Sequence, residues 1–95
     1  MDKITPAQVD QAFARWIRAL EELQLVEPGR RWVLQHGSAT NGRPWAWFEE
    51  SDTGGLFEPP IGSSLLGWTA REAYDQLLDR TTVVWDVYHA LERKD

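Results

Sequence analysis

The chain has 95 residues with six tryptophans, no cysteine and a formal net charge of −5. A chain this short supports one hydrophobic core, so we expect residues 1–95 to form a single domain. The absence of cysteine excludes disulfides and thiolate chemistry, and the acidic balance argues against binding to nucleic acid or anionic membranes. No apolar run approaches the length of a transmembrane helix, and the first residues lack an apolar signal region. We therefore expect a cytoplasmic protein that does not associate with membranes.

The first predicted element is a helix over residues 6–26. Thr5 suits the N-cap position, a proline follows it, and Gln8 lies three residues after the cap. Apolar residues then recur at the spacing of one helical face, at Val9, Phe13, Trp16, Ile17, Leu20 and Leu23. The Pro28-Gly29 pair is expected to end this helix.

A β-hairpin follows, because two aromatic and β-branched runs, 31–36 and 45–50, flank a turn-forming sequence. A two-residue loop at 41–42 would place the apolar Leu34 opposite the acidic Glu49. A four-residue loop over 39–42 instead pairs charge with charge and apolar with apolar residues: Arg31 with Glu50, Val33 with Phe48 and Leu34 with Trp47. The sequence therefore favours the four-residue loop.

The segment after the hairpin predicts a short third strand at Leu56–Phe57, which the Pro59-Pro60 pair ends. Residues 58–67 are expected to be irregular and to pack as a covering loop. Trp68 precedes the next helix, and we expect it to be buried as the apolar residue before the cap.

The last predicted element is a helix of about 24 residues over 69–92, capped by Thr69 and Glu72. The β-branched run within it leaves a strand at 81–88 as the alternative. The elements together predict an α+β fold in the order α-β-β-(β)-α, a small antiparallel meander packed against two helices, of which the C-terminal one is long.

Both faces of the predicted hairpin carry apolar side chains: Trp32, Leu34, Trp45 and Trp47 on one, and Val33, Ala46 and Phe48 on the other. An antiparallel sheet with one wet face alternates apolar and polar residues, so the face away from the helices needs a cover. Segment 56–68 is one candidate for that cover. The other is a protein partner, and because tryptophan is enriched in binding hot spots, Trp45 and Trp47 are candidate contact residues.

The last predicted helix carries a second apolar ridge at Val83, Val87 and Ala90, outside its main stripe. A helix of ~36 Å can extend past a domain of this size, so the ridge indicates contact between helices of two chains, most simply a homodimer. The alternative is that the first helix or the N-terminus covers the ridge. Together with Trp85, the predicted protein-interaction residues are Trp45, Trp47, Val83, Trp85 and Val87, and the predicted partner is a host protein or a second copy.

No catalytic, cofactor-binding or metal-binding motif is present, so we expect a noncatalytic protein without a cofactor. His36 and His89 lack neighbours at metal-ligand spacing. The acidic cluster between residues 49 and 58 is expected to be a solvated turn, answered locally by two of the arginines at 30, 31 and 43. The order of elements resembles that of the double-stranded RNA-binding domain, but the last helix opens without the lysine cluster that grips phosphates. We therefore exclude RNA binding.

A second hypothesis is an acidic protein that mimics nucleic acid and blocks a nucleic-acid-binding protein. It requires carboxylates in a line on one surface. The outer side of the last helix carries four of them, Glu72, Asp75, Asp79 and Asp86, although Arg71, Arg80 and Arg93 dilute this row.

Two stretches, Gly37–Phe48 and Leu66–Ala73, resemble segments of small uncharacterised proteins encoded by actinobacterial phages. The scarcity of lysine agrees with such a source, since only Lys3 and Lys94 occur among ten basic residues. The resemblance implies expression in the cytoplasm of a bacterial host, as a phage accessory protein. It carries no catalytic residues.

Overall fold

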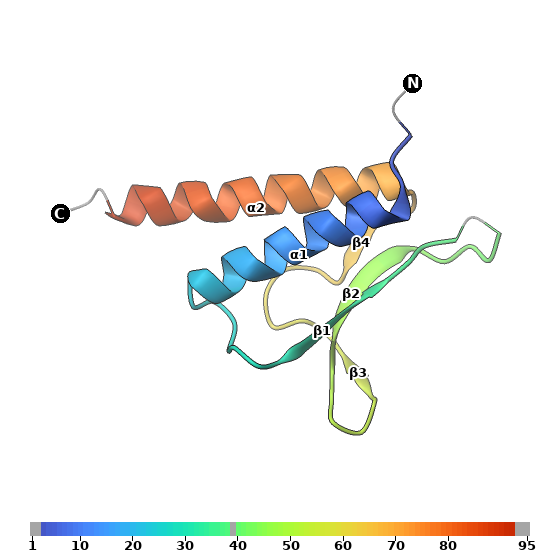
Figure 1. Ribbon diagram of the computed structural model, residues 1–95, viewed down its shortest axis with the longest axis horizontal. Coiled ribbons are helices and arrows are strands. Elements are labelled where there is room, and N and C mark those ends of the chain that lie inside the picture. The colour runs from blue at the N-terminus through green and yellow to red at the C-terminus, as the bar shows by residue number, and fades with distance from the viewer. Residues whose placement is uncertain (1–2, 39, 93–95) are drawn as a thin grey trace.

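Two helices and four antiparallel strands make up the chain in a computed structural model, which describes residues 3–38 and 40–92 (Figure 1). The elements are α1 (Pro6–Glu22), β1 (Arg31–Gln35), β2 (Trp45–Glu50), β3 (Leu56–Phe57), β4 (Leu65–Gly67) and α2 (Ala70–Glu92). The two helices lie side by side and run in the same direction along one side of the sheet (Figure 1). The predicted α+β fold is confirmed, with one strand more than expected.

The start of α1 is the predicted capping box. The backbone N–H of Thr5 donates to Oε1 of Gln8 at 2.8 Å, and the backbone N–H of Gln8 donates to Oγ1 of Thr5 at 3.3 Å. These two bonds satisfy amides that no helical carbonyl can reach, which fixes the first turn.

The end of α1 comes at Glu22, before residue 26 where the sequence placed it. Gln24 adopts a left-handed conformation with φ 59°, which stops the helix. The Leu25 N–H then donates to the Leu20 carbonyl at 2.8 Å and the Gln24 N–H to the Glu21 carbonyl at 3.1 Å, the Schellman pattern. The sequence did not reveal this ending because glycine, rather than glutamine, usually occupies that position.

The register of β1 and β2 is the predicted one, with Arg31 opposite Glu50, Val33 opposite Phe48 and Leu34 opposite Trp47. Ser38 and Arg43 close the hairpin through two reciprocal backbone hydrogen bonds of 2.9 Å. The connection between them has the expected four residues, 39–42, of which Ala39 lies outside the described residues.

β2 is the central strand, with β1 on one edge and both β3 and β4 on the other. β3 confirms the predicted third strand. β4 corrects the expectation of an irregular covering loop over 58–67, because Leu65 and Gly67 pair with β2. β3 and β4 extend the sheet at the edge of β2 instead of covering its second face. A strand of three residues is too short for its alternation to be read from sequence.

α2 is one continuous helix, so the alternative of a strand at 81–88 is wrong. The Thr69 side chain accepts from the Glu72 N–H at 3.1 Å, and the Glu72 carboxylate accepts from the Trp68 N–H at 3.0 Å. Within the β-branched run, the Thr81 hydroxyl donates to the Leu77 carbonyl at 2.7 Å, so its polar atom is satisfied inside the helix. Neither described helix is long and apolar enough to cross a membrane.

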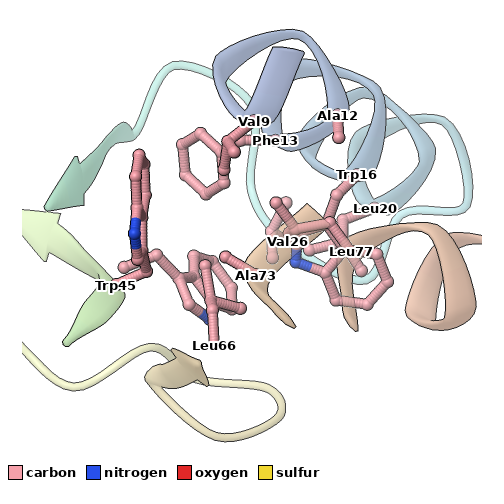
Figure 2. Packing of buried hydrophobic residues seen from close by; sticks show 11 residues of the cluster. Val9, Ala12, Phe13, Trp16, Leu20, Val26, Trp45, Leu66, Ala73 and Leu77 are labelled. Atoms are coloured by element: carbon pink, nitrogen blue, oxygen red, sulfur yellow. The ribbon is translucent and has the colours of Figure 1, made fainter. Parts of the chain in front are cut away.

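The core lies between the helices and the tryptophan-bearing face of the hairpin (Figure 2). Trp47 is at its centre, with ring centroids 6.0 Å from Phe13, 6.3 Å from Trp16 and 5.6 Å from Trp32. Its indole N–H donates to the Ser63 carbonyl at 2.9 Å, which ties the loop before β4 to the core. Aromatic rings therefore supply much of the buried mass that a chain without disulfides needs.

Candidate protein-interaction surface

Trp45 and Trp47 lie in the core, with 4% and 0% of their surface exposed. The expectation that they form a contact surface is therefore wrong. Their face of the hairpin packs against α1, so its tryptophans cover the domain's own helix and not a partner. On the other face of the hairpin Ala46 is also buried, and Val33 and Phe48 are half-buried.

Trp85 is half-buried and does not share a surface with Val83 and Val87. It lines a shallow groove between the helices together with Arg15 and Ala19 of α1. Its ring stacks on that of His89, with centroids 5.9 Å apart. Two helical positions separate it from Val83, which places it about 200° around the helix axis. The structure thus brings only two of the five predicted contact residues together on one exposed surface.

We name this surface the α2 ridge and define it by Val83, Val87 and Leu91, which are 58%, 53% and 64% exposed. Their spacing of four residues places them along one side of the helix. Among the described residues of α2, none after Leu77 is buried, and the helix continues past the end of α1 (Figure 1). By its helical periodicity Leu91 belongs to the stripe of core residues. It is exposed because α2 extends beyond the part of the domain that forms the core.

A hollow of about 360 Å³ adjoins the α2 ridge and shares Val83 with it. Trp16 and Val84 give it apolar walls, and the loop at 62–63 forms its opposite side. Arg80 also lines this hollow. Gln76 and Asp79 line it as well, so an aliphatic side chain from outside the domain would contact apolar walls beside polar side chains.

The Arg80 guanidinium joins α2 to the loop that precedes and enters β4. It donates to the Ser63 carbonyl at 2.9 Å and to the Leu65 carbonyl at 3.2 Å. Its Nε also donates to the Gln76 side chain at 3.0 Å. Burial lowers the pKa of Arg80 because it disfavours the charged form. These bonds hold the wall of the hollow in place.

Trp68 is 59% exposed, so the expectation that it is buried is also wrong. Its backbone takes part in the helix cap, but its ring lies outside the core. Leu56, Phe57 and Leu65 are exposed as well, on the strands at the same edge of β2. Sequence periodicity missed these residues because short strands at an edge carry no repeating pattern.

The charged residues of the hairpin mostly pair with one another. Arg30 contacts Glu49 at 2.7 Å and Arg31 contacts Glu50 at 3.8 Å. This confirms that two of the three arginines form ion pairs with the acidic cluster. Hydrogen bonds to Glu49, and then to Glu27, raise the pKa of Arg30. Pairs at this exposure contribute little to stability.

The two histidines lie beside tryptophan rings in separate parts of the fold. The His36 ring lies tilted against that of Trp45, with centroids 4.8 Å apart, and its Nε2 lies 2.8 Å from Oδ1 of Asp10 in α1. His89 stacks on Trp85 near the end of α2. Within residues 3–38 and 40–92, no three histidine or carboxylate side chains gather where they could hold a metal ion.

The acidic residues on the outer side of α2 are partly engaged. The Glu72 carboxylate is bound in the helix cap, and Asp75 lies 3.5 Å from Arg71. In the part of the chain that the structure describes, Asp79 and Asp86 have no ion-pair partner. The row of four carboxylates therefore presents only two without a structural contact.

No family model matches this chain, and neither a curated protein nor a solved structure does.

Proposed function

We propose that this chain is a noncatalytic protein-interaction module that contacts its protein partner through the α2 ridge. As the resemblance to phage proteins implies, it works as a phage accessory protein in the cytoplasm of a bacterial host. One observation carries the proposal: three aliphatic side chains, each more than half exposed, lie on one side of a helix that extends past its core. Aliphatic surface gathered in this way marks sites of protein contact.

The size of the α2 ridge agrees with a contact role. Fully burying one aliphatic side chain contributes ~1.5–3 kcal/mol, so burying the exposed half of three such side chains contributes about 2–4.5 kcal/mol. A contact of this size is enough to anchor an interface when surrounding residues exclude water. While this aliphatic surface stays exposed to water, it does not stabilise the folded domain.

The nucleic-acid mimic is not proposed as a second function. Such a mimic needs a continuous row of carboxylates, and Glu72 and Asp75 serve the helix cap and an ion pair.

Site-specific photo-crosslinking tests the proposal in the bacterial cells that produce the protein. Val87 is replaced by p-benzoylphenylalanine, and Leu56 is replaced in the matched control because its exposure of 51% is close to the 53% of Val87. We expect a discrete protein adduct from position 87 that position 56 does not give. Identical adducts from the two positions, or none from position 87, would contradict the proposal.

A further inference from the structure

We propose that the partner of the α2 ridge is a second copy of this chain, whose α2 packs antiparallel against the first with Leu91 of each copy seated in the other's hollow. This inference rests on the proposed function and names its partner. A two-fold dimer requires a self-complementary surface, on which a projecting group and its receptor lie on the same face of one molecule. The α2 ridge and the hollow meet that requirement.

The projecting group and the receptor lie along one side of α2. Leu91 is the most exposed residue of the ridge, and the hollow is centred on the helix near Arg80, between Gln76 and Val84. The guanidinium of Arg80 is held by backbone carbonyls, so its methylene stem is fixed as part of the receptor. A leucine can therefore pack against this stem and the apolar walls, beside the exposed carboxylate of Asp79, which also lines the hollow.

The register of the dimer follows from this pairing. When Leu91 of one copy lies opposite Arg80 of the other, the two-fold axis passes between positions 85 and 86. Val84 then faces Val87 of the second copy, twice by symmetry. The seam is therefore aliphatic at its centre, as antiparallel helix pairs require.

The contact area that α2 offers to a second copy indicates a weak dimer. The helix from Arg80 to Leu91 is about 18 Å long, and packing it on its copy buries on the order of 500 Å² per protomer. The total of roughly 1,000 Å² is at the lower limit for a specific interface. We expect a weak, reversible dimer with a dissociation constant on the order of 10–100 µM.

Single-cysteine crosslinking tests the register, because the chain has no cysteine of its own. In the proposed dimer the two copies of position 87 are offset by ~4.5 Å along the helix axis, whereas those of position 91 are offset by ~16 Å. A disulfide requires Cα atoms roughly 4.4–6.8 Å apart. We therefore expect Val87→Cys to form a covalent dimer under mild oxidation and Leu91→Cys to remain a monomer. Leu56→Cys is the control for random collision.

Sedimentation equilibrium of the unmodified protein accompanies the crosslinking. We expect the average mass to rise above 11.0 kDa as the concentration passes ~100 µM. Equal crosslinking at positions 87, 91 and 56 would overturn the register. An average mass of 11.0 kDa at every concentration would show that the partner is not a second copy of the chain. A different protein photo-crosslinked to position 87 would leave the proposed function standing, so the two failures are distinguishable.

Discussion

Replacing Trp47 by phenylalanine is expected to destabilise the domain by about 3 kcal/mol. The indole N–H that donates to the Ser63 carbonyl is lost, which costs ~1 kcal/mol. The smaller ring leaves a void beside Phe13, Trp16 and Trp32, and the lost burial and the void together cost ~2 kcal/mol. The same change at Trp68, which is 59% exposed, is expected to cost less than ~0.5 kcal/mol.

Urea unfolding followed by far-ultraviolet circular dichroism measures both variants. This signal is independent of tryptophan fluorescence, which the substitutions themselves alter. A loss of ~3 kcal/mol lowers the melting temperature of a domain of this size by more than ~10 °C. Equal losses of stability in the two variants would refute the assignment of Trp47 to the core and of Trp68 to the surface.

Three further substitutions test the backbone and the wall of the hollow. Gln24→Gly is expected to stabilise the domain by about 0.5–1 kcal/mol, because glycine adopts the left-handed conformation without a steric penalty; a lower melting temperature would contradict this. Gly67→Ala is expected to cost about 2 kcal/mol in urea unfolding, since its new Cβ would lie 2.6 Å from Cβ of Glu72 and 3.0 Å from the Ala73 nitrogen; an unchanged midpoint would contradict the close approach of β4 to α2. Arg80→Lys keeps the charge but loses the guanidinium fork that donates to two backbone carbonyls. We expect the free energy of unfolding to fall by about 1 kcal/mol and amide hydrogen exchange in β4 to become faster. Unchanged exchange in β4 would show that these hydrogen bonds do not hold the strand.

Local patterns in the sequence predicted the elements that depend on neighbouring residues. The capping box of Thr5 and Gln8 placed the start of α1, and the pairing of charged and apolar residues placed the hairpin register. Both depend on interactions within a few residues or across one turn, which a sequence displays directly. The end of α1 was not predicted because Gln24 adopts a left-handed conformation that a glutamine in the sequence does not indicate.

Exposure, by contrast, depends on where the core ends. Leu91 shares the periodicity of the buried stripe, and Trp68 has the place of a packed residue before a cap, yet both are exposed. Trp45 and Trp47 looked like contact residues on a hairpin that was apolar on both faces, and they are core. A helical or strand period specifies which side chains share a face, while the position of neighbouring elements decides whether that face is covered.

Solvent paramagnetic relaxation tests whether Trp45 and Trp47 lie in the core and whether the α2 ridge is exposed. A soluble gadolinium chelate is added at a protein concentration at which sedimentation shows the monomer, and the indole N–H and methyl proton relaxation rates are measured. We expect fast relaxation for the Trp68 indole and for the methyls of Val87 and Leu91, and slow relaxation for the indoles of Trp45 and Trp47. Hairpin indoles that relax as fast as that of Trp68, or ridge methyls protected in the monomer, would contradict this expectation.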